Sequence, residues 1–245
     1  MARHFVIMSS SYSKGTRIAI DYSKEEELKT EFIEKQVERI KSECGETVPI
    51  SIHSVQTETE DWNSLVKADN FFQDVEVVDI DEFIRLVNID RKLKGIDVAK
   101  YILSRIDCTH LKLEKLVYLC YAEYLVQNKE KLFEDKIYAF RYGPVVQTVY
   151  DKYKTFGDET VQDIDLIVDE ILNIMPARSR ILFADAGTKK LECIDEIIKK
   201  YGDYKASELV ELTHKEKTPW SETFNNENFQ EIEDETILQY HNFEK

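Results

Sequence analysis

A helical repeat of apolar side chains marks the middle of the chain. From Leu113 to Leu125, apolar residues recur at the i, i+3, i+4 and i+7 spacing of one helix face. The opposite side of the segment is also largely apolar, because it carries Tyr118 and Leu119. A helix that is apolar on most sides is typical of the centre of a folded unit. We therefore predict a central helix over Leu111–Gln127 that serves packing and binding rather than catalysis.

Helical periodicity continues on both sides of this segment. Gly202 directly follows Tyr201 and is expected to end one of these helices. Ile137–Tyr142 fits a short strand or an extended arm. The second half of the chain is therefore predicted to be a small helical bundle. The other predicted helices are Ile96–Ile106, Pro144–Lys154, Asp163–Asn173, Thr188–Tyr201 and Lys205–Thr213.

The first ninety or so residues show a different pattern, in which apolar and polar residues alternate. Ile18, Ile20 and Tyr22 occupy every second position, as in a strand with one buried face. The polar residues before them end in Gly15 and suit a hairpin turn. The pattern does not specify the order of the strands. The four predicted strands are His4–Ser9, Thr16–Tyr22, Val48–Val55 and Val75–Val78.

Capping-box patterns mark two helix starts in the same region. Ser23 and Asp79 each precede a Glu by three residues, so the side chain of each partner can accept a hydrogen bond from the backbone N–H of the other. Gly45 is expected to end the first of these helices. The helices predicted in this region are one that begins at Ser23, one over Asn63–Asn70 and one over Ile80–Val87.

A charged segment, Asn88–Gly95, separates the two halves and is the predicted linker. The predicted fold class is therefore α+β. A small N-terminal α/β domain over residues 1–90, with about four strands and packed helices, precedes a mainly α-helical domain over residues 96–222. Residues 223–245 form an acidic C-terminal tail, which we expect to be loosely held as an amphipathic segment.

Composition narrows the class of protein. The chain has 245 residues and a formal net charge of -15, which on average repels a phosphate backbone, so we expect no nucleic-acid partner. No apolar run is long enough to span a membrane, and the N-terminus does not resemble a secretion signal. The four scattered cysteines fit reduced thiols. A cytoplasmic protein without a membrane partner is the expectation.

Motifs for catalysis, metal binding or cofactor binding do not emerge from the sequence. Zinc sites favour C-x-x-C or H-x-x-x-H spacing, whereas Cys108 and His110 form the one close pair of these residue types. None of the common phosphate-loop, dinucleotide or nucleophile-elbow patterns occurs. We therefore predict no catalytic residue, no metal and no cofactor.

Aromatic residues instead point to protein binding. The chain has 13 Tyr and 12 Phe, and many lie between Tyr118 and Tyr153. Aromatic and Arg side chains are the usual anchors of protein interfaces. Tyr121 and Tyr124 lie on the apolar helix face and are predicted to be core. Tyr118 and Tyr142 fit a core position and a partner contact equally well.

Several short motifs in the second half resemble one known family. The helix sequence Leu-Lys-Leu-Glu-Lys-Leu from Leu111 to Leu116 is followed by Phe-Arg-Tyr-Gly-Pro-Val from Phe140 to Val145, and later by Thr213-His214 and Pro219-Trp220. In this order and spacing, they resemble the Panacea domain, a SocA-like antitoxin domain also described as a phage-associated protein. The resemblance covers roughly residues 96–222.

Two residues depart from the family pattern. The family usually has Gln at the position of Glu114 and often Trp at the position of Phe140. The exchange at Glu114 bears on what this helix face binds.

The resemblance implies an antitoxin of a bacterial or prophage toxin–antitoxin system. Such a protein binds a toxin encoded by a neighbouring gene and neutralises it by direct contact. The N-terminal domain would then shape the choice of partner. The alternatives are a proteolytic adaptor that presents its partner to a protease, a DNA-binding autoregulator of the same operon, and, less favoured, an enzyme in the N-terminal domain.

The family motifs also suggest which residues contact the partner. Lys112 and Lys115 lie three apart on one helix, where a solvated face is the simpler interpretation. His214 ends a helix, where the helix dipole favours a cation. The predicted partner-binding residues are Lys112, Lys115, Tyr118, Tyr142 and His214.

Three further motif residues are predicted to serve the fold. Gly143 permits a turn, and Pro144 fits the first position of a helix, where the missing N–H has no cost. Trp220, after Pro219, is expected to fold back onto the bundle as a lid. The predicted structural motif is therefore Gly143, Pro144 and Trp220.

Overall fold

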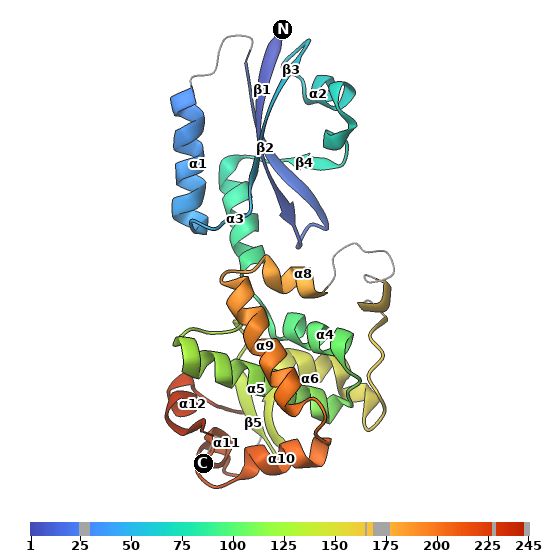
Figure 1. The fold of residues 1–245 in the computed structure, drawn as a ribbon, viewed down its shortest axis with the longest axis vertical. Coiled ribbons are helices and arrows are strands. Elements are labelled where there is room, and N and C mark those ends of the chain that lie inside the picture. The colour runs from blue at the N-terminus through green and yellow to red at the C-terminus, as the bar shows by residue number, and fades with distance from the viewer. Residues whose placement is uncertain (25–29, 165, 169–176, 227–228, 243–245) are drawn as a thin grey trace. The chain divides into compact units, whose positions relative to one another are not determined.

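The computed structural model describes residues 1–24, 30–164, 166–168, 177–226 and 229–242. They form two compact units, Met1–Arg91 and Lys92–Lys245. The first is a sheet with helices and the second is mainly helical, which confirms the predicted α+β class (Figure 1).

The N-terminal unit is built on a four-stranded mixed sheet. Its strands are β1 (Ala2–Ser11), β2 (Thr16–Lys24), β3 (Ser51–Thr57) and β4 (Val75–Val77), in the order β3-β1-β2-β4. The hairpin β1–β2 is antiparallel, with Ile7 opposite Ile20, and β4 runs parallel to β2. The alternation of apolar residues does not predict the strand order, because β4 is short and pairs with β2, which lies far from it in the sequence.

Both faces of this sheet are covered. Ile7, Ile18 and Ile20 point to one face, where α1 (Thr30–Cys44) and α3 (Ile80–Arg91) pack on them. Val6, Met8 and Ala19 alternate onto the other face, beneath α2 (Trp62–Ala68) and the short 3-10 helix η1 (Asn70–Phe72). The helices α1 and α2 lie on opposite sides of the strands in Figure 1.

The helical unit is organised around α5 (His110–Asn128), which is buried without interruption from Leu113 to Ala122. This is the central helix that the apolar repeat predicts. Around it lie α4 (Gly95–Arg105), α6 (Gln147–Tyr153), α9 (Gly187–Tyr201) and α10 (Ala206–His214). The remaining described helices are η2 (Lys154–Phe156), α8 (Ala177–Leu182), α11 (Pro219–Thr223) and α12 (Asp234–Tyr240).

A small sheet completes the helical unit. The strands β5 (Ile137–Phe140) and β6 (Gly143–Val146) form a hairpin, and β7 (Gln230–Glu231) pairs with the other edge of β5. Of the two alternatives for Ile137–Tyr142, a strand and an extended arm, the structure therefore has the strand.

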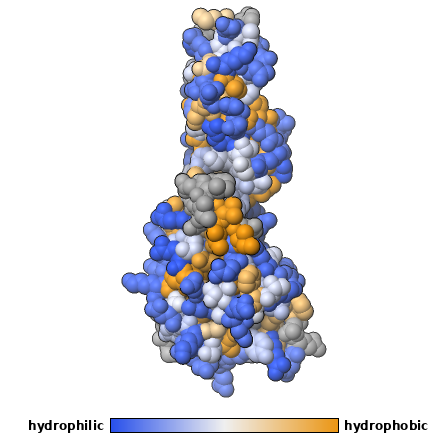
Figure 2. Space-filling model, turned by 90° about the vertical axis from the view of Figure 1, so that its right-hand side faces the viewer, coloured by the Kyte–Doolittle hydropathy of each residue, from blue (hydrophilic) through white to orange (hydrophobic). Residues whose placement is uncertain are grey.

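The surface is largely polar, as expected for an acidic chain. On the face shown in Figure 2, hydrophilic side chains predominate and apolar ones gather in a few places. Tyr142 and Phe229 are among the large apolar or aromatic residues that remain more than half exposed. None of the described helices has the length and apolarity needed to cross a membrane.

Two predicted helix starts are wrong. Ser23 lies in β2, and the first helix is described only from Thr30, so the Ser23 cap does not exist; Glu26 lies outside the described residues. Pro144 lies inside β6, and the helix after it begins at Gln147. A proline is compatible with a strand at a position that needs no ladder N–H, and here Gly143 and Pro144 open the strand.

The cap at Asp79 exists, because its carboxylate accepts from the backbone N–H of Glu82 at 2.9 Å. The linker prediction is wrong at its start, because α3 continues to Arg91, which is buried. The predicted helix Asp163–Asn173 falls partly on residues 165 and 169–173, which lie outside the described part of the chain.

The expectation of a loosely held tail is wrong for residues 229–242. Ile232 and Ile237 are buried in the core of the helical unit. Tyr121 of α5 donates a hydrogen bond to Asp234 at 2.7 Å, which fastens α12 to the central helix. In the sequence, these two isoleucines stand among acidic residues, so the local pattern does not indicate a buried segment.

Candidate functional site

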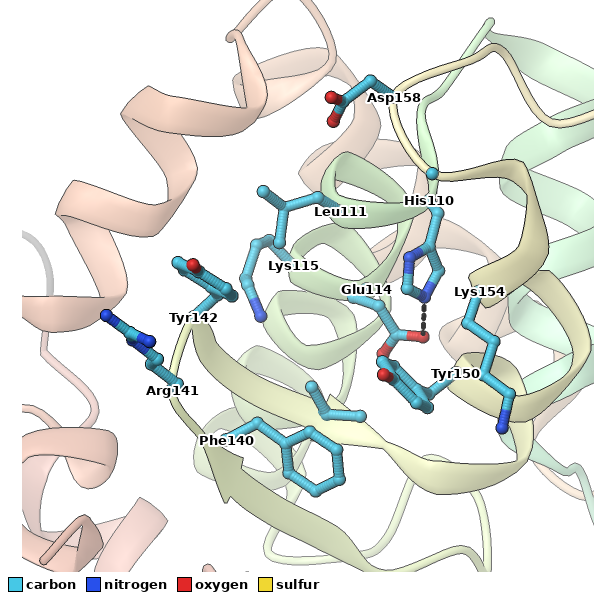
Figure 3. Close-up of a pocket in the computed structure, with 12 residues that line it drawn as sticks. His110, Leu111, Glu114, Lys115, Phe140, Arg141, Tyr142, Tyr150, Lys154 and Asp158 are labelled. Atoms are coloured by element: carbon cyan, nitrogen blue, oxygen red, sulfur yellow. Dashed lines mark ion pairs between the residues drawn. The ribbon is translucent and has the colours of Figure 1, made fainter. Parts of the chain in front are cut away.

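A pocket of about 550 Å³ opens beside the first turns of α5 (Figure 3). Three segments form its walls: the start of α5, the hairpin β5–β6, and α6 with the loop that follows it. All three belong to the helical unit. The lining residues are His110, Leu111, Glu114, Lys115, Phe140, Arg141, Tyr142, Val145, Tyr150, Lys154, Gly157 and Asp158.

Local sequence places the charged residues of α5 in this pocket. Thr109 caps the helix, with its hydroxyl accepting from the N–H of Lys112 at 3.4 Å. His110 and Glu114 are then one turn apart on the same side of the helix. The pocket therefore has polar groups at its base although α5 is apolar elsewhere.

Glu114 is a buried carboxylate with one oxygen left without a hydrogen-bond partner among the described residues. Its side chain is 1% exposed. The N–H of Val146 donates to Oε2 at 3.2 Å, whereas Oε1 lies 3.6 Å from Nε2 of His110, too far for a hydrogen bond. Among the described residues, Oε1 has no hydrogen-bond partner. Burial raises the pKa of Glu114, and the neighbouring His110 and Lys115 oppose that shift.

Lys115 is fully buried next to Glu114. Its ammonium donates to the carbonyl of Pro144 at 2.7 Å. Burial lowers the pKa of Lys115 to about 8, with the charge of Glu114 acting in the opposite direction. The lysine thus joins the central helix to the β5–β6 hairpin.

Gly143 makes this contact possible. Its φ of +106° lies in the region that L side chains rarely adopt, and a Cβ there would lie 3.0 Å from Cε and Nζ of Lys115 and from Oγ1 of Thr213. Gly143 opens β6 directly after the turn of the hairpin, so both its backbone conformation and the close approach of Lys115 require glycine.

Trp220 bonds the β5–β6 hairpin through its indole ring. The indole N–H donates to the carbonyl of Phe140 at 2.7 Å. His214 stacks on the indole ring at 3.6 Å between centroids, and Phe224 stacks at 4.7 Å. Trp220 therefore packs against the hairpin and the end of α10. Burial lowers the pKa of His214, and the nearby charge of Lys115 adds to this.

The structure brings together some of the predicted partner-binding residues and separates others. Lys115 and Tyr142 line the pocket, and Tyr142 is 60% exposed at its rim. His214 is not among the lining residues; it stacks on Trp220, and the charge of Lys115 is close enough to act on it. Lys112 donates to the carbonyl of Gly202 at 2.5 Å, and Tyr118 is fully buried.

A solvated face for the two lysines is therefore the wrong interpretation for Lys115, because its side chain is buried. Lys112 is half-buried and bonds the end of α9. Sequence reasoning overlooked His110 as a site residue. The signal available was its i,i+4 spacing to Glu114, two ionisable side chains on an apolar helix.

Residues 113–221 match the family described as Antitoxin SocA-like, Panacea domain, which confirms the resemblance seen in the sequence. The matched region runs from α5 to α11 and contains Glu114, the β5–β6 hairpin and Trp220. No curated protein and no solved structure matches the chain.

Proposed function

We propose that this protein is an antitoxin that binds a toxin encoded by a neighbouring gene and neutralises it by direct contact, without catalysis. The observation that carries the proposal is the match of residues 113–221 to the SocA-like Panacea domain. The site supports it, because a partly exposed aromatic rim around a pocket suits a protein interface. A cytoplasmic location belongs to the same proposal.

We further propose that the N-terminal unit contributes to the choice of partner. It lies outside the matched region and has its own cores on the two faces of its sheet. Exchange of this unit between related antitoxins would then change which toxin is neutralised.

Co-expression in a bacterial host tests the main proposal. The neighbouring gene is induced alone, together with this gene, and together with a copy of this gene that carries an early stop codon. We expect growth arrest in the first and third cultures, and growth in the second. A neighbouring gene that is harmless alone, or that stays toxic beside this one, contradicts the proposal.

Purification of the pair separates direct neutralisation from its main alternative. A tagged antitoxin is expected to retain its partner as a stable complex. If the partner instead disappears from the cells and no complex is recovered, and its half-life recovers in a protease-deficient host, the protein is a proteolytic adaptor and direct neutralisation is wrong.

A further inference from the structure

We propose that the pocket beside α5 receives a neutral aromatic side chain of the partner protein, one that carries an N–H or O–H donor, and that Oε1 of Glu114 accepts its hydrogen bond. The proposal rests on the proposed function, because the occupant belongs to the bound partner. Three features of the pocket support it: the orphaned oxygen at its base, its balance of charges, and its aromatic walls.

The base of the pocket requires a donor. As a carboxylate, Glu114 can only accept hydrogen bonds. Its Oε2 already accepts from Val146, whereas Oε1 has no hydrogen-bond partner among the described residues and makes the longer ion-pair contact with Nε2 of His110, 3.6 Å away, that Figure 3 draws. Buried polar atoms are nearly always hydrogen-bonded in folded proteins, so an unsatisfied oxygen on a residue that lines a pocket indicates the position of a ligand donor.

The charges around the pocket favour a neutral occupant. Lys115, Arg141 and Lys154 bring positive charge to its lining, and Glu114 and Asp158 bring negative charge. An arginine or lysine of the partner would be placed among three cations, and an aspartate or glutamate would face the carboxylate at the base. A neutral N–H or O–H group satisfies Oε1 without either repulsion.

The walls favour an aromatic occupant. Phe140 and Tyr150 meet edge to face at 5.3 Å, and the ring of His110 lies 5.1 Å from that of Tyr150. Aromatic rings pack well in such edge-to-face surroundings, and tryptophan and tyrosine combine a ring with a polar donor. The volume of about 550 Å³ lies in the range of ligand pockets and accommodates one such ring with part of its backbone.

A small probe tests the pocket without the partner. N-acetyl-tryptophanamide is titrated into the full-length, 15N-labelled protein, with N-acetyl-leucinamide as the control. We expect the tryptophan probe, at millimolar concentration, to shift the amide signals of residues 110–115, 140–143, 145 and 146, and the leucine probe to leave them in place. Equal shifts with both probes, or no shifts, overturn the proposal.

Substitutions then test the pocket in the complex. Tyr142→Ala removes an exposed ring at the rim, and Tyr204→Ala removes an exposed ring that does not line the pocket. We expect Tyr142→Ala to weaken partner binding about tenfold and Tyr204→Ala to change it by no more than about twofold. Both positions are exposed, so both variants are expected to fold, which a thermal melt checks.

Two further variants test the base and the space of the pocket, Glu114→Gln and Leu111→Trp. The glutamine keeps an acceptor oxygen and is expected to retain binding, whereas a tryptophan at Leu111 fills the pocket from α5 and is expected to abolish binding of partner and probe alike. If the complex forms and both Leu111→Trp and Tyr142→Ala bind the partner like the wild type, the inference is wrong and the proposed function stands. If no complex forms with the wild type, both are wrong.

Discussion

Two buried tyrosines of α5 differ in a single hydrogen bond. Tyr121 donates its hydroxyl to Asp234 at 2.7 Å, whereas the hydroxyl of Tyr118 has no partner among the described residues. Both rings are buried in the same core. The hydroxyl of Tyr118 therefore loses its hydration without compensation, and that of Tyr121 exchanges water for a carboxylate. Accordingly, burial raises the pKa of both phenols well above the ordinary range.

We predict that removing these two hydroxyls changes the free energy of unfolding differently. Tyr121→Phe is expected to lower the free energy of unfolding by about 1.5–3 kcal/mol, because a hydrogen bond to a charged group is lost. Tyr118→Phe is expected to leave the free energy unchanged or to raise it, because only an unpaired polar atom is removed. Urea unfolding of the two variants makes the comparison, and a loss in Tyr118→Phe as large as that in Tyr121→Phe would contradict it.

At the scale of elements, Lys115 couples the central helix to the β5–β6 hairpin through a charge that burial disfavours. Its pKa falls from 10.5 to about 8. Between these two pH values the unfolded chain binds more protons at this position than the folded protein, so the free energy of unfolding gains from Lys115 as pH rises. Below about pH 8 the folded state carries the full cost of the buried charge.

We predict that the amine of Lys115 titrates near pH 8 in the folded protein, which 13C NMR of the lysine Cε carbons measures, with Lys115→Met for assignment. The difference in stability between the wild type and Lys115→Met is expected to shift in favour of the wild type from about pH 8 to 10.5. The two proteins must be compared because burial also raises the pKa of Cys108, and this lowers the free energy of unfolding of both as pH rises. A Lys115 signal that titrates with the surface lysines would refute the prediction.

The sequence predicts elements well where one local rule dominates. The central helix is evident because α5 is apolar on nearly every side, and β1 and β2 are evident from strict alternation. The start of α6 was misplaced because Pro144 fits a helix start and the start of a strand equally well. In the structure, Pro144 pairs with Ala139 of β5 and its carbonyl accepts from Lys115, 29 residues earlier. Such a contact is not visible in a local window.

The candidate site was predictable only in part for the same reason. Tyr142 and Lys115 follow from the motif, and both line the pocket. The burial of Lys115 and Tyr118 depends on which elements cover α5, including α12 from the acidic tail. Helical spacing places residues on a face, but it does not say what covers that face.

At the scale of the whole molecule, the chain consists of two units with separate cores. The core residues of the N-terminal sheet lie between Val6 and Val87, and those of the helical unit lie between Leu93 and Ile237. Each core is assembled from residues of one unit only. We propose on this basis that the two units are independent domains, with the boundary near Arg91.

We predict that residues 1–91 fold when they are expressed alone. The fragment is expected to show dispersed amide signals in NMR and a cooperative thermal transition, because it retains both sheet faces and their covering helices. A fragment that ends at residue 79 serves as the control, because it lacks α3 and is expected to be unfolded. Failure of the longer fragment to fold would show that the units depend on each other.

The position of the last core residues has a consequence during synthesis. Strand β7 and helix α12 supply Ile232 and Ile237, yet they pair with β5 and α5, which precede them by roughly a hundred residues. The N-terminal unit has all its parts once Arg91 has left the ribosome, whereas at about 5–20 residues per second β7 and α12 follow β5 only after on the order of ten seconds. Over that interval the nascent helical unit exposes an unfinished sheet edge and an uncovered flank of α5. A newly made copy is therefore a candidate for chaperone or protease capture before it can hold a partner.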